Sequence, residues 1–168
     1  MAAPGNCVRK GIFLLLGSNL GDPASNLETA RQEIAARIGS IVRLSSVYKT
    51  DPWGNINQAV FLNQVISAET ELDPQTVLES IEAIEHSMGR VRLTKWGARI
   101  IDIDILFYGD EIIHREDLDI PHVGIPFRRF TLQPLFEIAP DFQHPELNKS
   151  IAELLAECKD NSRVERVS

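Results

Sequence analysis

The stretch KWGARIIDIDILFYG, residues 95–109, reads in its second half as a buried strand, because the positions from Ile100 to Tyr108 are mostly bulky, β-branched or aromatic. Two acids interrupt this apolar run. Asp102 and Asp104 stand two positions apart, so both carboxylates leave the same face of the strand. Two ionised acids beside a core repel each other and resist desolvation, so the pattern requires a nearby positive charge.

A divalent cation is one source of that charge, since Mg²⁺ binds one or two carboxylates together with substrate phosphates. Just upstream, Arg90, Arg92, Lys95 and Arg99 occur with no acid among them. Arginine donors match phosphate oxygens in geometry and charge. The combination predicts a metal-dependent polyphosphate site. The alternative is a solvated strand face beside a surface loop, with no metal bound.

Composition limits the classes of function. The 168 residues suffice for one domain with a core, and 43% hydrophobic with 24% charged residues is ordinary for a globular protein. The net charge of −7 argues against a general nucleic-acid binder, which needs a basic face. An anionic substrate must therefore be held by a local cationic cluster, such as residues 90–99.

The remaining features concern the setting of the protein. The apolar run Ile12 to Leu16 is too short to span a bilayer, so we expect no membrane partner. Cys7 and Cys158 fit two free thiols better than a disulfide framework. We expect a cytoplasmic monomer.

The order of elements predicts the fold class. Apolar runs at Gly11–Leu16, Ile41–Lys49 and Phe61–Thr70 read as strands. One helix begins at Asp22-Pro23 and ends at Gly39, and a second begins at Asp73-Pro74 and ends at Gly89. With the aspartate strand the order is β-α-β-β-α-β. This order predicts an α+β, two-layer, ferredoxin-like core with a mostly antiparallel sheet and both helices on one face.

Extra C-terminal short helices are predicted beyond this core, at Arg128–Leu132 and Pro134–Ile138, and after the capping box Ser150-Ile151-Ala152-Glu153. A short strand is predicted at Glu111–Ile113. For the domain organisation we expect a loose leader at 1–10, a single domain at 11–158 and a polar tail at 159–168 that frays.

The chain also resembles a known family. The run from Lys95 to Leu106 is similar to the signature of 6-hydroxymethyl-7,8-dihydropterin pyrophosphokinase, an enzyme of folate biosynthesis. The resemblance extends from Gly11 to about Ala156, through the motifs GSNLG at 17–21, VYKT at 47–50, FLN at 61–63, GRVR at 89–92, IPH at 120–122 and PLFEIAP at 134–140.

The resemblance implies an ATP-dependent diphosphotransferase that moves the diphosphate group of ATP to the hydroxymethyl group of the pterin and releases AMP. Two Mg²⁺ ions would arrive with ATP and be held by Asp102 and Asp104. It further implies catalytic roles for Arg90 and Arg99 beside these acids. Phosphoryl transfer asks a protein mainly for positioning and charge neutralisation, which this residue set can supply.

The resemblance also implies the substrate contacts. The ATP-binding residues would be Glu82, Arg92, Trp96, Arg99, Ile105, His122 and Arg128. The pterin-binding residues would be Thr50, Asp51, Trp53, Phe61, Asn63, Trp96 and Phe130, with Glu85 and Asn19 in support. The chain departs from the family pattern at Asp117 and Asp119, where relatives can carry basic or hydroxyl residues near ATP.

Two other classes of function remain open at the level of sequence. One is another Mg²⁺-dependent nucleotidyl or glycosyl transferase that uses Asp-x-Asp. The other is a ferredoxin-like binding module without catalysis, although such a module gains little from clustered, mutually repelling acids.

Overall fold

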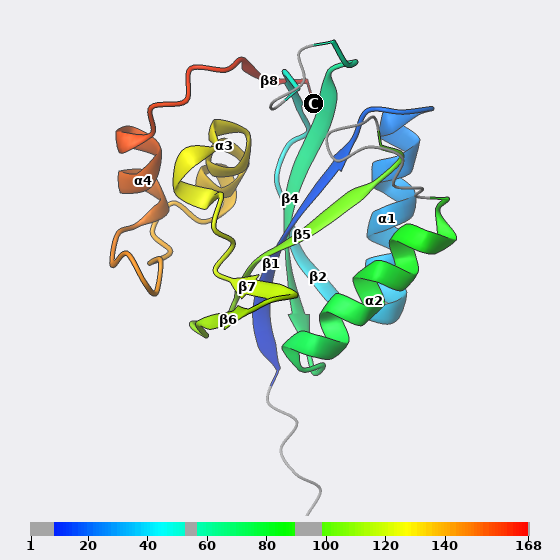
Figure 1. Cartoon of the computed structure of the whole chain (residues 1–168), viewed down its shortest axis with the longest axis horizontal. Coiled ribbons are helices and arrows are strands. Elements are labelled where there is room, and N and C mark those ends of the chain that lie inside the picture. The colour runs from blue at the N-terminus through cyan, green and yellow to red at the C-terminus, as the bar shows by residue number, and fades with distance from the viewer. Residues whose placement is uncertain (1–8, 53–56, 90–98, 168) are drawn as a thin grey trace, which may run out of the picture.

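An antiparallel sheet runs through the middle of the molecule, with helices on both of its faces (Figure 1). The computed structural model describes residues 9–52, 57–89 and 99–167. The strand order is β5-β1-β4-β3-β8, and β2 pairs with β4 as well. The strands are β1 (Lys10–Ser18), β2 (Gly39–Leu44), β3 (Tyr48–Thr50), β4 (Phe61–Thr70), β5 (Asp102–Tyr108) and β8 (Val164–Arg166).

The predicted ferredoxin-like core is confirmed, with one refinement in its second strand. The run predicted at Ile41–Lys49 forms two short strands, β2 and β3, which pair with successive parts of β4. They are separated at Ser45, whose amide donates to Val65 O at 2.9 Å while its hydroxyl accepts from Val65 N at 3.0 Å. The serine side chain therefore replaces a backbone partner and lets the strand change course.

Helices α1 (Pro23–Arg37) and α2 (Pro74–Ser87) cover one face of the sheet. Both begin as predicted: Asp22 Oδ1 accepts from Ser25 N at 3.2 Å, and Asp73 Oδ1 accepts from Thr76 N at 2.8 Å. Gly89, at φ +86°, follows the end of α2. Their buried stripes pack on the sheet through Leu27, Ala30, Ile34, Val77, Ile81 and Ile84. Ala35 has the spacing of the first stripe but is exposed.

Gly39 belongs to the sheet instead of ending the helix. A Cβ at this position would lie 2.0 Å from Glu69 O on β4. The residue is therefore glycine because two strand backbones approach closely, and α1 already ends at Arg37.

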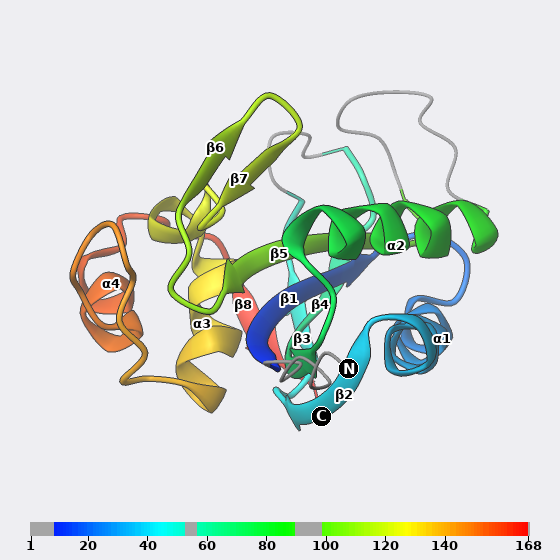
Figure 2. The same ribbon diagram turned by 90° about the horizontal axis from the view of Figure 1, so that it is seen from below.

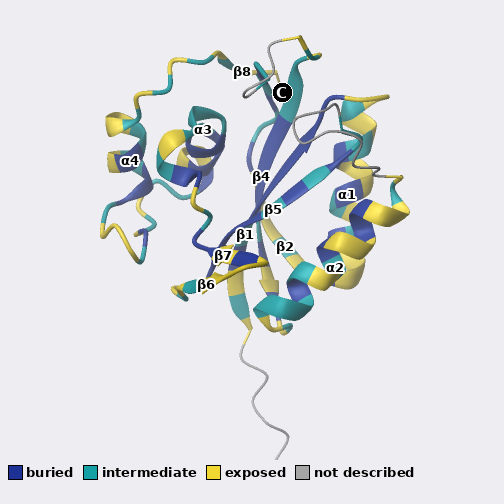
Figure 3. Ribbon diagram, viewed as in Figure 1, coloured by how far each residue is buried: buried dark blue, intermediate teal, exposed yellow. Residues whose placement is uncertain are grey.

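The opposite face is covered in part by η1 (Ile125–Phe127), α3 (Arg129–Ile138) and α4 (Ile151–Glu157), so the C-terminal helices add a partial third layer. The two short helices predicted around residue 133 are one helix with Pro134 inside it. Burial of Leu132, Leu135 and Ile138 against Leu15 and Val65 offsets the lost backbone hydrogen bond. Figure 3 shows the dark buried stripe along the sheet between the two helical layers.

A hairpin and the tail complete the chain. The short strand predicted at Glu111–Ile113 is displaced to β6 (Ile113–Arg115), which pairs with β7 (Leu118–Ile120) in a hairpin that projects beside α2 (Figure 2). The expectation that residues 159–168 fray is wrong for Val164–Arg166, which pair with β3 as β8. Backbone pairing at an open sheet edge needs no apolar side chains, so hydrophobic periodicity does not reveal it.

Within the described residues, every helix is too short or too polar to cross a bilayer.

Candidate active site

A glycine creates a hollow in the sheet on the face that carries α3. Gly17 on the central strand β1 pairs with Asn63 on β4 and with Asp102 on β5. Because alternate side chains of a strand share a face, this row places an amide and a carboxylate on either side of a position without a side chain. A Cβ on Gly17 would lie 2.6 Å from Asn63 Oδ1. The hollow therefore depends on glycine at this position.

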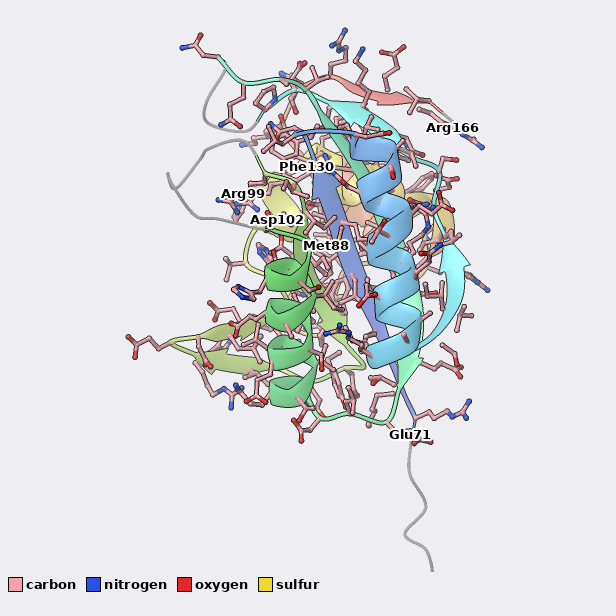
Figure 4. All side chains as sticks on the ribbon, turned by 90° about the vertical axis from the view of Figure 1, so that its right-hand side faces the viewer. Glu71, Met88, Arg99, Asp102, Phe130 and Arg166 are labelled. Atoms are coloured by element: carbon pink, nitrogen blue, oxygen red, sulfur yellow. The ribbon has the colours of Figure 1, made fainter. Side chains whose placement is uncertain are left out.

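The hollow opens into a pocket that we call the sheet pocket. Its walls come from the strand face, the end of β3, the segment before β5 and the start of α3. It is lined by Leu15, Gly17, Thr50, Asp51, Gln58, Phe61, Asn63, Arg99, Asp102, Asp104, Arg128 and Phe130. In Figure 4, Arg99 and Asp102 lie side by side near Phe130, although Phe130 comes from the opposite layer.

One side of the sheet pocket combines an amide with aromatic rings. Asn63 and Thr50 are both buried, and Asn63 Nδ2 donates to Thr50 Oγ1 at 2.6 Å. This bond fixes the orientation of the Asn63 amide. Phe61 and Phe130 add ring surfaces, and Arg128 Cζ lies 5.8 Å from the Phe130 ring centroid. A flat, polar-edged aromatic ligand suits such a site.

The other side carries the carboxylates. Asp102 and Asp104 share a face, as predicted, and both line the sheet pocket. Arg99 Nη1 lies 3.3 Å from Asp102 Oδ1, with the two side chains 20% and 30% exposed. Among the described residues no group of three or more potential ligand side chains gathers. Two carboxylates that leave the remaining positions to phosphate and water fit Mg²⁺, which binds in this manner at phosphate-transfer sites.

A second pocket, the edge pocket, follows the outer edge of β5 between α2 and the β6–β7 hairpin. Asp104 lines both pockets and so marks their junction. The other lining residues are Leu78, Ile103, Ile105, Glu116, Asp117, Leu118, Asp119, His122 and Val123. Two of its acids have basic neighbours, since His114 Nδ1 lies 3.1 Å from Asp119 Oδ1 and Arg115 Nε lies 3.8 Å from Asp117 Oδ1.

His122 is held as a neutral imidazole. Burial lowers its pKa and the nearby Arg128 charge lowers it further, although Asp102 and Asp119 oppose the shift. Its Nδ1 accepts from Gly124 N at 3.0 Å, so in the neutral ring the proton resides on Nε2. His122 therefore offers the edge pocket a hydrogen-bond donor without a full charge.

Asn19 links two segments that reach the sheet pocket. Its backbone N donates to Arg99 O at 3.0 Å, and its Oδ1 accepts from Arg99 N at 2.7 Å. Its Nδ2 donates to Gln58 Oε1 at 3.1 Å and to Ala59 O at 3.0 Å. Asn19 is 5% exposed and does not itself line the sheet pocket, so the supporting role predicted for it would have to act through Arg99 and Gln58.

Most of the residues predicted for the site come together. The sheet pocket gathers Thr50, Asp51, Phe61, Asn63, Arg99, Asp102, Asp104, Arg128 and Phe130, and the edge pocket gathers Ile105 and His122. Glu85 is buried in the last turn of α2, whereas Glu82 is exposed on α2 and lines neither pocket. The predicted residues Trp53, Arg90, Arg92 and Trp96 lie outside the described part of the chain.

Among the residues that line the sheet pocket, sequence reasoning missed Leu15, Gly17 and Gln58. For Gly17 a signal existed, because a glycine at the end of an apolar strand often marks a close approach of another group. For Gln58, which lies in a loop, no periodicity or motif gave a signal.

Comparison with known proteins identifies the family. The family model for 7,8-dihydro-6-hydroxymethylpterin-pyrophosphokinase (HPPK) matches residues 13–140. The chain is 41% identical over 153 residues to the 2-amino-4-hydroxy-6-hydroxymethyldihydropteridine pyrophosphokinase of Haemophilus influenzae, covering 90% of this chain and 95% of that protein. It is 43% identical over 156 residues to the protein of the same name from Methylorubrum extorquens, covering 92% and 97%.

A solved structure is similar in fold. The crystal structure of wild-type Plasmodium falciparum HPPK-DHPS matches with a TM-score of 0.74 at 21% sequence identity, over 89% of this chain and 45% of that chain. This chain therefore spans less than half of that longer protein. The family match over most of the chain, the identity to full-length relatives and the shared fold establish together that the chain belongs to the HPPK family.

Proposed function

We propose that this protein transfers the diphosphate group of ATP to the hydroxymethyl group of 6-hydroxymethyl-7,8-dihydropterin, releasing AMP, in folate biosynthesis. The observation that carries the proposal is the position of Asp104, which lines both the sheet pocket and the edge pocket. A carboxylate at the junction of two pockets can hold a cation that touches both substrates, as a group transfer between them requires.

The pterin would occupy the sheet pocket. Its ring is flat and carries donors and acceptors on its edge, which suits the ring surfaces of Phe61 and Phe130 and the oriented amide of Asn63. This position would direct the hydroxymethyl group toward Asp102 and Asp104, which line the same pocket.

The nucleotide would occupy the edge pocket. Leu78, Ile105 and Val123 offer an apolar surface for the base. The hairpin acids Asp117 and Asp119 are unsuited to phosphate, so we propose that the phosphates extend past Asp104 toward Arg99 and Arg128 of the sheet pocket. The Nε2–H of neutral His122 would donate to a phosphate oxygen without a full charge.

The proposed cofactor is Mg²⁺, as two ions that arrive with ATP and are held by Asp102 and Asp104. When bound, such ions neutralise phosphate charge and lower the pKa of a coordinated hydroxyl group. The protein residues contribute position. Arg99 pairs with Asp102 at 3.3 Å and holds that carboxylate in place, and Asn19 binds both the backbone N–H and the carbonyl of Arg99. If a general base takes the hydroxyl proton, Asp104 is our candidate.

We also propose that the protein acts as a monomer. Light scattering of the active protein would test this. A dimer that is needed for turnover would contradict it.

The decisive assay mixes ATP, Mg²⁺ and 6-hydroxymethyl-7,8-dihydropterin and detects AMP. We expect AMP and the pterin diphosphate in equal amounts, and no turnover when Mg²⁺ is chelated. Release of inorganic diphosphate or of ADP would instead indicate a nucleotidyl transferase or an ordinary kinase. Binding of both ligands without turnover would indicate a non-catalytic module.

A further inference from the structure

The C-terminal segment 159–167 crosses both walls of the sheet pocket. After α4 the chain passes the start of α3 and then returns to the sheet edge as β8 (Figure 1). Two sets of contacts attach it there, one to α3 and one to β3. The two attached walls are the ones that carry Phe130 and Thr50 into the sheet pocket.

The first attachment is Asp160 at the start of α3. Asp160 Oδ2 accepts from Arg129 N at 2.9 Å, and its Oδ1 accepts from Ser162 N at 2.9 Å. Arg129 is the first residue of α3, and the N-cap residue Arg128 makes no side-chain capping bond to this helix. Asp160, 31 positions away in sequence, therefore supplies the acceptor that a local cap would normally provide.

This capping bond is made by the residue between two that line the sheet pocket. Arg128 and Phe130, on either side of Arg129, both line it. Burial raises the pKa of Asp160, but hydrogen bonds from the amides of Ser162 and Arg129 outweigh burial and lower it below its usual value. The carboxylate is thus ionised at neutral pH and is favourable at a helix N-terminus.

The second attachment is to β3 and the residue that follows it. Val164 pairs with Thr50 and Arg166 with Tyr48. Arg163 contacts Asp51 twice, through its backbone N to Oδ2 and through Nη2 to Oδ1, each at 3.4 Å. Thr50 and Asp51 both line the sheet pocket, and Thr50 orients Asn63.

We propose that residues 160–166 form a strap that sets the separation of the α3 wall and the β3 wall of the sheet pocket. Asp160 is the positioning residue for Arg128 and Phe130, and Arg163 is the positioning residue for Asp51. Loss of either attachment widens the pocket and weakens binding of the flat aromatic substrate. The inference rests on the proposed function, in which that substrate is the pterin.

The strap can be loosened without loss of the core. Among the described residues, neither hydrophobic cluster includes a member of 159–167. The sheet and its helices therefore bury their apolar faces without this segment, and its contacts are polar or backbone pairings. A single substitution here is expected to change the geometry of the sheet pocket more than it changes the folded population.

The test compares KM for the pterin with KM for ATP in full-length variants. Asp160→Ala should raise the pterin KM about five- to tenfold, the equivalent of one lost cap. The ATP KM should rise by a clearly smaller factor, because Arg128 is only one of the groups proposed to meet the phosphates. Asp160→Asn keeps one acceptor and should recover part of the loss. Arg163→Ala should raise the pterin KM by a smaller factor, since its side chain is 55% exposed.

The matched control is Glu157→Ala. Glu157 is also an acid near the C-terminus, and its carboxylate accepts from Lys149 Nζ at 2.6 Å, but it lines neither pocket. We expect no change in either KM. If Asp160→Ala does not fold, Arg163→Ala decides the question.

Four results would overturn the strap: an unchanged pterin KM, a parallel rise in both KM values, a fall in kcat alone, or an equal effect of the control. Each of these results counts against the strap only if the wild-type protein produces AMP from ATP in the presence of the pterin. A wild-type protein that produces no AMP would refute the proposed function instead.

Discussion

Gly17→Ala should selectively impair the sheet pocket. The added Cβ would lie 2.6 Å from Asn63 Oδ1 and 3.7 Å from Phe61 Cδ1. The first distance is well inside van der Waals contact, so a group has to move. Asn63 Oδ1 is the end of a side chain, whereas moving Gly17 would shift the central strand, which pairs on both sides. Rotation of the Asn63 amide therefore costs less free energy than displacement of the strand.

That rotation has a calculable cost. It breaks the 2.6 Å bond from Asn63 Nδ2 to Thr50 Oγ1, and both residues are buried. A buried hydrogen bond lost with its partner left unsatisfied costs about 1–2 kcal/mol, which corresponds to about a five- to thirtyfold rise in the KM for the pterin. The unfolding free energy should fall by only about 1 kcal/mol, because alanine in a strand recovers about 0.5–1 kcal/mol relative to glycine.

The assay is steady-state KM for the pterin at saturating MgATP, with thermal unfolding of the same samples. Gly11→Ala is the control, since Gly11 lies on the same strand and a Cβ there meets nothing within 4 Å. A double-mutant cycle with Asn63→Ala should show that the effect of Gly17→Ala largely disappears when the amide is absent. An unchanged KM in Gly17→Ala, or an undiminished effect in the Asn63→Ala background, would refute the reasoning.

Four further predictions follow from the site and from buried His144. Asp102→Asn or Asp104→Asn should abolish Mg²⁺-dependent turnover and leave circular dichroism unchanged, because one of two repelling carboxylates is neutralised; near-normal activity would contradict the metal assignment. Calorimetry should show tighter pterin binding in the presence of MgATP analogue, since Asp104 lines both pockets, and equal affinity would exclude ordered binding. Asn19→Ala should lower the unfolding temperature and raise both KM values, because it removes the bonds that hold Arg99 and Gln58. The control Asn26→Ala, which removes bonds to Ser18 Oγ and Leu20 O in the same turn, should lower stability alone. Identical kinetics of the two variants would count against a positioning role for Asn19. Burial lowers the pKa of His144 below its usual value of 6.5, so near that pH the folded state binds fewer protons than the unfolded chain. The contribution of His144 to stability is therefore complete above pH 6.5 and should be lost as the pH falls below it. Denaturant titrations at several pH values should show a weaker pH dependence of the unfolding free energy in His144→Asn, and an unchanged pH dependence would exclude this histidine as its cause.

Local patterns were reliable wherever short-range chemistry controls the backbone. Asp22, Asp73 and the Ser150 capping box begin helices as predicted, since each side chain binds an amide three residues away. The shared face of Asp102 and Asp104 followed from strand geometry alone. The β-α-β-β-α-β order then restricted the topology to a ferredoxin-like sheet, because few arrangements bury both helices on one face.

The features that the sequence did not reveal depend on partners distant in the chain. Gly39 was predicted to end a helix, yet its lack of a side chain is required by the carbonyl of Glu69 on another strand. Ala35 had the spacing of a buried stripe but faces solvent. Periodicity describes one element at a time and carries no information about strand register.

The sequence by itself therefore determined the elements of the β-α-β-β-α-β core, the acid pair and the family. Local sterics, helix capping and the helix and strand periodicities act within a few residues, so they can be recognised from the sequence alone. The tertiary structure alone decided that Gly17 lies between Asn63 and Asp102, that Asp104 joins two pockets, and that Asp160 caps a helix that begins 31 residues earlier. These juxtapositions are set by strand register and by the packing of whole elements, which only the complete set of long-range contacts can fix.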